Sequence, residues 1–213
     1  FTDATTDVDT LAISDSGQAV TYTDADGYTI GSVDSINGVT GSNIALTATT
    51  GNLIVSNTSA ANDIDASGTL ALTASALSAS ITINSSADVE GTSGAHTYTA
   101  DVMDISGTVT ATGQTVTLKP TTAASRAINL GTGTGALDLT DTELDNITAS
   151  TLRIGANDSS TGAITVTSDI SPANVSTLHL RTLSTITGTA GGIVVANLAL
   201  TAGGTINFTD ATT

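Results

Sequence analysis

The chain contains 213 residues, 39% of them hydrophobic, and its 20 acidic and only four basic side chains give a formal net charge of -16. The hydrophobic fraction argues against intrinsic disorder. Nucleic acid and anionic membrane surfaces are excluded as partners, because both are bound through clustered Lys and Arg.

The composition also limits the core. The chain has two Phe, three Tyr, no Trp and no Cys. No apolar run approaches the length of a membrane-spanning helix. An interior built from Ile, Val, Leu, Ala and Thr has to be thin and regular. Without Cys there is neither a disulfide frame nor a thiolate metal site. Almost all acids are Asp, which favours turns over helices.

Short segments in which apolar residues alternate with polar ones recur from one end of the chain to the other. Each predicts a β-strand of about four to six residues with every second side chain facing inward. No window shows the spacing of a sustained amphipathic helix. In chain order the predicted strands are 10–14, 43–48, 52–56, 69–74, 80–85, 115–119, 127–131, 136–140, 151–155, 163–168, 177–181, 197–202 and 205–209.

Between these strands a Gly precedes the next apolar strand by one or two residues, as at Gly51, Gly68 and Gly113. We expect such glycines to supply the positive φ of a tight bend. Two architectures fit short strands with glycine corners. A β-sandwich would use longer strands, hairpin turns and larger core residues. The narrow aliphatic core favours a parallel β-helix, in which successive coils stack.

The hexapeptide FTDATT occurs at 1–6 and again at 208–213, so the chain restarts after 207 residues. Self-similarity at a fixed period is typical of repeat architectures. We therefore predict that 1–207 is one long β-helical repeat unit and that 208–213 begin the next. At about 20 to 25 residues per coil, one unit would contain roughly eight to ten rungs. Phe208 should face inward, and Phe1 should fill the same position one unit earlier.

Two stretches, 151–208 and 7–55, resemble the repeat region of filamentous-haemagglutinin-type giant bacterial adhesins. The second contains the steps VDTLA, YTDADGYTIGSVD and TGNLIV. The resemblance implies a right-handed parallel β-helix. It also implies a secreted or surface-attached protein that serves in adhesion or as an extracellular scaffold.

Candidate catalytic residues are few. The two His residues, His96 and His179, lie near no G-x-S-x-G nucleophile elbow, and alternation places His179 outward on a strand. Paired acids can serve glycosidases and lyases, but the chain has almost no aromatic or basic residues to line a substrate groove. We therefore predict no enzymatic activity, no catalytic residue and no organic cofactor.

Paired aspartates could instead bind Ca²⁺, which takes six to eight oxygen ligands. The D-x-D pairs are Asp7/Asp9, Asp24/Asp26 and Asp63/Asp65. The nearest candidate is TDADG at 23–27, where Asp24 and Asp26 precede a Gly but lack a downstream bidentate acid. The alternative is that these aspartates cap backbone amides in turns.

The leading hypothesis is a structural repeat of a giant secreted bacterial protein that forms an extracellular fibre, adhesin stalk or biofilm-matrix filament. Its partners would be neighbouring repeats end to end, other fibres through lateral self-association, and glycans. An alternative is an adhesin module that binds a glycan or cell surface, and a third is a carbohydrate-active β-helix enzyme.

Overall fold

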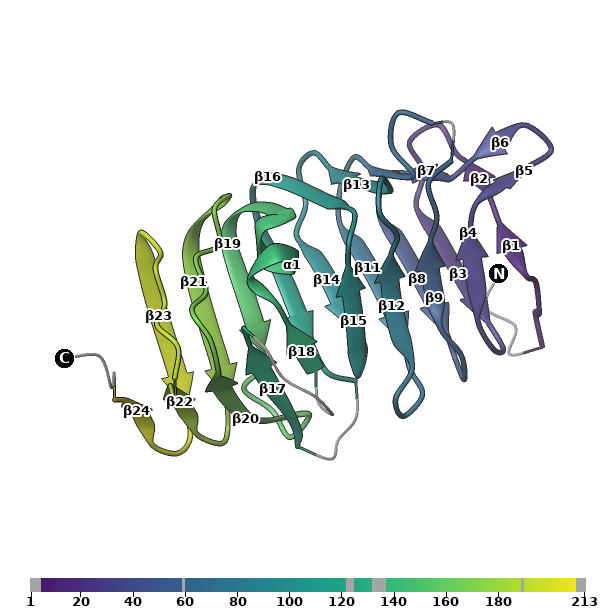
Figure 1. The fold of residues 1–213 in the computed structure, drawn as a ribbon. Coiled ribbons are helices and arrows are strands. Elements are labelled where there is room, and N and C mark those ends of the chain that lie inside the picture. Colours follow the sequence, from purple (N-terminus) through teal and green to yellow (C-terminus); the bar gives the residue numbers. More distant parts are fainter. Residues whose placement is uncertain (1–4, 59, 122–124, 132–136, 189, 210–213) are drawn as a thin grey trace.

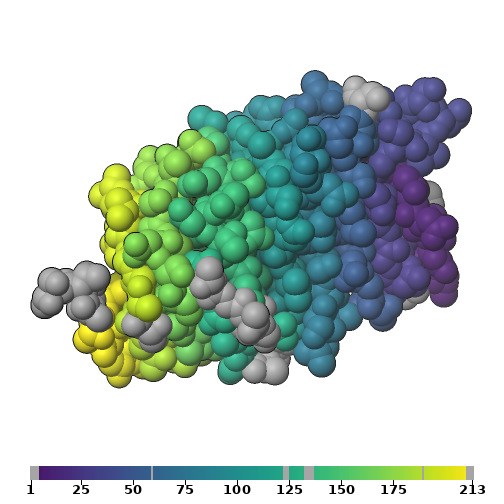
Figure 2. Space-filling view, viewed as in Figure 1, coloured from purple at the N-terminus to yellow at the C-terminus, as the bar shows by residue number. Residues whose placement is uncertain are grey.

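The computed structural model describes residues 5–58, 60–121, 125–131, 137–188 and 190–209 (Figure 1). Within this part of the chain the fold is all-β, as predicted, and contains 24 strands and one short helix. The named strands pair in parallel except in one hairpin, formed by β5 (Ser32–Val33) and β6 (Ile36–Asn37). The chain advances from one end of the molecule to the other (Figure 2).

The strands form three rows. Row 1 consists of two five-stranded sheets that lie end to end, because β15 of the first contacts β18 of the second. In spatial order its strands are β1 (Thr10–Leu11), β4 (Tyr28–Ile30), β9 (Leu53–Val55), β12 (Ser80–Ile83), β15 (Val102–Ile105), β18 (Leu137–Leu139), β17 (Arg126–Leu130), β20 (Thr161–Val166), β22 (Ile186–Gly188) and β24 (Ile206–Phe208).

Rows 2 and 3 belong to one curled 12-stranded sheet, because the long strands β16 (Thr108–Lys119), β19 (Ile147–Gly155) and β21 (Val175–Thr182) run through both. Row 2 begins with β2 (Ile13–Ser14), β7 (Val39–Gly41), β10 (Ile64–Ala66) and β13 (Asp88–Gly91). Row 3 contains β3 (Val20–Asp24), β8 (Ile44–Ala48), β11 (Leu70–Ala74), β14 (His96–Thr99), the later parts of β16 and β19, then β21 and β23 (Asn197–Ala202).

Each time the chain leaves row 3 and returns to it, it forms what we call one excursion. Neighbouring strands of row 3 come from successive excursions and are well separated in the sequence. The pair His96 and Val116 has one of the shortest separations, and the pair Val116 and Leu152 has the longest. Most excursions of the chain add one strand to each row, whereas the excursion between β16 and β19 adds both β18 and β17 to row 1. Parallel strands in curled sheets with this connectivity are compatible with a β-helix.

In most strands of the three rows, alternate residues face a single core that lies between the rows, whereas the residues of the β5–β6 hairpin stay outside it. Every predicted strand segment overlaps an observed strand, because Ile, Val and Leu at every second position bury one face of a pleated strand. Inward side chains stack in register along row 3, and this column consists of Tyr22, Leu46, Leu72, Tyr98, Leu118, Ile154, Leu180 and Leu200.

The role predicted for the corner glycines is only partly right. Gly113 has a φ of +76° and allows the bend inside β16, but Gly51 and Gly68 have no positive φ. These glycines instead allow the backbones of stacked corners to approach each other closely. A Cβ on Gly94 would overlap the backbone of Gly68 in the corner below it. Corners that stack at the spacing of β-strands therefore exclude side chains at these positions.

The helix α1 (Asp141–Asp145) was not predicted. Thr140 accepts a hydrogen bond from the Glu143 amide at 3.3 Å, and the Glu143 carboxylate accepts one from the Thr140 amide at 2.8 Å. This reciprocal pair is a capping box, which starts a helix even in an Asp-rich segment. The helix lies between β18 and β19 and buries Leu144.

Candidate functional site

The TDADG candidate lies at the first strand of row 3, where the chain leaves β3. Asp24 is fully buried. Its Oδ2 accepts hydrogen bonds from the Tyr22 hydroxyl at 2.7 Å and from the Val8 amide at 3.2 Å, and its Oδ1 accepts one from the Asp26 amide at 3.2 Å. Burial and this contact raise the pKa of Tyr22, so its hydroxyl stays protonated and donates. Asp24 therefore already caps backbone amides, as the alternative interpretation expected.

The structure brings a third carboxylate to this pair. Oxygens of Asp7, Asp24 and Asp26 all lie within 4.8 Å of one another, and Asp7 and Asp26 are exposed. The sequence analysis had paired Asp7 with Asp9 instead. Three carboxylates supply part of the oxygen shell that Ca²⁺ requires, although the Asp24 oxygens already accept three hydrogen bonds.

The third D-x-D pair is split by the start of a strand. Asp63 precedes β10 and is buried, whereas the side chain of Asp65 points outward. The Asp63 carboxylate accepts hydrogen bonds from the amides of Thr58 at 2.6 Å and Asp88 at 2.8 Å. Because Thr58 and Asp88 belong to different excursions of the chain, Asp63 ties two of them together.

The histidines lie far apart in the fold and have different surroundings. His96 in β14 is fully buried, its Nδ1 is 3.2 Å from the Tyr98 hydroxyl, and burial lowers its pKa to about 4. His179 in β21 faces outward, as predicted, and its Nε2 is 3.0 Å from the Thr201 hydroxyl. Burial and, to a lesser extent, Arg153 and Arg181 lower the pKa of His179.

The sequence analysis missed a basic cluster on the outer side of row 3. Lys119, Arg153, His179 and Arg181 all have outward, half-buried side chains on the adjacent strands β16, β19 and β21. Lys119 and Arg181 also help to lower the pKa of Asp158, after the hydrogen bonds from Ser160. The segments TVTLK, TLRIG and TLHLR carried the signal, since each places a basic residue at an outward position.

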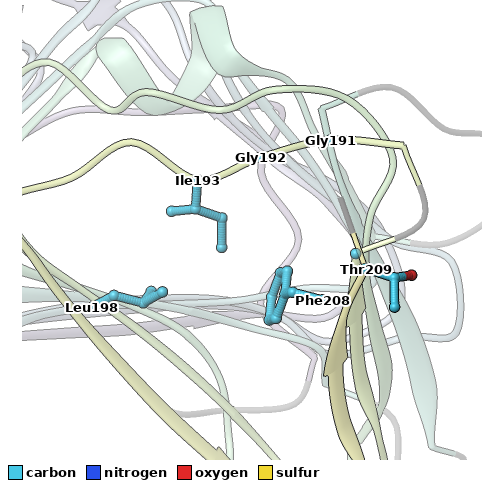
Figure 3. Close-up of a pocket in the computed structure, with 7 residues that line it drawn as sticks. Gly191, Gly192, Ile193, Leu198, Phe208 and Thr209 are labelled. Carbon is cyan, nitrogen blue, oxygen red and sulfur yellow. The ribbon is translucent and has the colours of Figure 1, made fainter. Parts of the chain in front are cut away.

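Both ends of the stack expose apolar side chains. At the carboxyl-terminal end, Ile193, Leu198 and Phe208 line a pocket together with Gly191 and Gly192 (Figure 3). The Phe208 ring lies against Gly188. At the other end, Thr6, Val8, Leu11, Ala12, Ile13 and Tyr22 line a second hollow. Phe1 lies outside the described residues, so the predicted equivalence with Phe208 is not tested.

Comparison of the chain with protein-family models, curated proteins and solved structures found no match. Among the described residues, no helix has the length and apolar character needed to cross a membrane. The function has to be inferred from the arrangement of the residues themselves.

Proposed function

We propose that this chain is a structural repeat of a secreted bacterial protein that forms an extracellular fibre, adhesin stalk or biofilm-matrix filament. The observation that carries the proposal is a stack of parallel strands whose end strands in row 3, β3 and β23, each pair with one named strand within the described part of the chain. Unpaired strand edges accept further strands. Solenoids grow by adding repeats that contact only their neighbours.

In this proposal the chain coils as a right-handed parallel β-helix with roughly eight to ten rungs per 207-residue repeat. Support comes from the parallel neighbours in row 3, each of which comes from the next excursion of the chain. We assign a right-handed coil because crossover connections between parallel strands strongly prefer that handedness. The chain then acts mechanically, as a rigid spacer without a catalytic step.

Proteins with one, two and three joined copies test the proposal by small-angle X-ray scattering and electron microscopy. Strands stack at about 4.8 Å, so each copy should lengthen a straight rod by roughly 40 to 50 Å. A series of separately tumbling globules would contradict the proposal.

The acidic surface suggests how rods interact laterally. A net charge of -16 keeps rods apart at low salt, and Ca²⁺ would bridge carboxylates of neighbouring rods. Bundling measured by light scattering should therefore rise with Ca²⁺ and fall when a chelator is added. Equal bundling with and without the chelator would exclude the cation bridge while leaving the rod intact.

The basic cluster favours a second candidate function, an adhesin module that binds an acidic glycan. Lys119, Arg153 and Arg181 are three of the four basic residues of the chain and lie on adjacent strands. A glycan array with the triple Gln variant tests it, and Arg126→Gln is the matched control because Arg126 lies 3.8 Å from Asp101. Only the triple variant should lose its binding to carboxylated glycans.

A further inference from the structure

We infer that the carboxyl-terminal end of the chain receives a second copy of the same chain in one defined register, in which β3 of the next copy pairs with β23. Resting on the proposed scaffold function, this inference names the strands that join. In the same step β24 replaces β1 as the neighbour of β4 in the next copy.

The pairing of β3 with β23 is inferred first from a short sequence that several strands share. The tetrapeptide ALTA ends three strands of row 3, at 45–48 in β8, 71–74 in β11 and 199–202 in β23. Within the described chain, β8 and β11 each lie beside a strand that contains TYT: β3 with 21–23 and β14 with 97–99. The ALTA of β23 pairs with β21 on one side, and no described strand covers its other side.

Residue pairs seen inside the chain fix the register. In the pair β11–β14, Leu72 lies opposite Tyr98, with Ala–Thr and Thr–Thr pairs on either side. Aligning β23 with β3 in the same way places Leu200 opposite Tyr22 and keeps the Ala–Thr and Thr–Thr pairs. The tyrosine hydroxyl needs no partner across the junction, because Tyr22 bonds to Asp24 just as Tyr98 contacts His96, two residues away.

The repeat period is compatible with this register. If Phe1 of the next copy takes the place of Phe208, the sequence separation between Leu198 and Val20 of that copy falls within the range seen between neighbours in row 3. Ile206 and Tyr28 of the next copy are separated by the same length of chain as Leu198 and Val20. Rows 3 and 1 therefore both continue with the same offset, as they also do from β21 to β23 and from β22 to β24.

In the single copy, the segment 6–11 occupies part of the place that the preceding copy would take. The Thr6 carbonyl accepts a hydrogen bond from the Ala25 amide at 2.7 Å, and the Leu11 carbonyl accepts one from the Gly31 amide at 3.0 Å. Leu11 also lies opposite Ile30 through the two-residue strand β1. This segment covers the amino-terminal end of the stack and must leave when a preceding copy docks.

The preceding copy supplies an acceptor for each amide that the segment releases. After β8, β11 and β23, the amide of the next residue donates a hydrogen bond to the carbonyl of the last residue of the preceding row 3 strand, as the Ser75 amide does to the Ala48 carbonyl. The same pattern directs the Ala25 amide to the Ala202 carbonyl. In row 1, β24 then takes the place of β1 and puts Phe208 where Leu11 packs in the single copy. The new acceptors are the carbonyls of Ala202, Ile206 and Phe208.

Engineered disulfides test the register, because the chain has no Cys of its own. In a tandem protein in which Phe1 of the second copy follows Asn207 of the first, we pair Ala199→Cys of the first copy with Thr21→Cys of the second. Both side chains face outward and lie opposite each other in the inferred register. The control pairs Ala199→Cys with Thr23→Cys, whose Cα atoms would be about 8 Å apart, beyond the reach of a disulfide.

A second comparison tests the exchange of strands. Thr10 and Thr29 lie opposite each other in the single copy. A Thr10→Cys and Thr29→Cys pair should therefore close in the 213-residue chain and stay open in the second copy of the tandem. There Asn207→Cys of the first copy should cross-link to Thr29→Cys instead.

Mass spectrometry after mild oxidation should find the disulfide in most molecules of each matched pair and in few molecules of the control. Equal cross-linking of the control pair, or none in the matched pairs, would overturn the inference. X-ray scattering of the same samples separates the two proposals. A straight double-length rod in which the control pair cross-links as well as the matched pairs would refute only the register. Two bodies that tumble independently would refute the scaffold function as well.

Discussion

Protonation of His96 should make the fold less stable in mild acid. The imidazole is fully buried in row 3 between strands of the core, with Nδ1 beside the Tyr98 hydroxyl and no hydrogen-bond partner for Nε2. A Cβ on Gly91 would overlap the ring, so no room is left for a water beside Nε2. In mild acid the folded protein therefore keeps His96 neutral, whereas in the unfolded chain this histidine becomes protonated.

The size of the effect follows from the two pKa values. Burial lowers the pKa of His96 from 6.5 to about 4, and each unit corresponds to about 1.4 kcal/mol. Because the folded value is the lower one, the contribution to stability is complete above pH 6.5 and is lost as the pH falls toward 4. The free energy of unfolding should drop by about 2 kcal/mol between pH 7 and pH 5, and by about 3 kcal/mol in total.

Urea unfolding of the wild type and of His96→Gln at pH 7, 6 and 5 measures this contribution. The wild type should lose stability over this range, whereas the variant should lose only what the carboxylates contribute. His179→Gln is the comparison variant, and it should keep the part of the pH-dependent loss that His96 causes because His96 is still present. A His96→Gln variant that loses stability as steeply as the wild type between pH 7 and pH 5 would refute the reasoning.

Three further predictions concern single residues. Gly94→Ala should lower the free energy of unfolding by about 1 to 3 kcal/mol, because its methyl group overlaps the corner below, whereas Gly192→Ala, which meets only ordinary contacts, should change it by less than about 0.5 kcal/mol. Thr140→Ala should cost about 1 kcal/mol in urea unfolding by removing the helix cap, and the exposed Thr142→Ala should not. Calorimetric titration should show Ca²⁺ binding that Asp26→Asn abolishes, and unchanged heats in this variant would exclude the aspartate site.

The strands could be predicted because the alternation of apolar and polar residues is visible within a few consecutive residues. A segment such as 69–74 buries Leu70 and Leu72 on one face wherever it lies in the fold, so its sequence alone indicates a strand. The pairing of these strands could not be predicted in the same way. The bend at Gly113, for example, lets one strand run through two rows, and no local pattern shows which neighbours it meets.

The missed features depend on contacts between distant residues. Glycine is required at 94 because this residue stacks on the Gly68 backbone of the preceding excursion of the chain, and this constraint appears only when the corners are placed one above another. Asp7 joins Asp24 for the same reason. The helix α1 is different, since Thr140 and Glu143 form a local capping box that was present in the sequence, but five residues are too few to show an amphipathic spacing.

The balance between the segment 6–11 and a preceding copy can be argued from the strands that each supplies. The segment offers β4 a two-residue strand, while a preceding copy would offer β4 the three residues of β24 and β3 the five that begin at Leu198. It would also cover Leu198 and Ile206, each 45% exposed in the single copy. Joining two copies therefore adds both backbone pairs and buried apolar surface, so the exchange should favour the joined state.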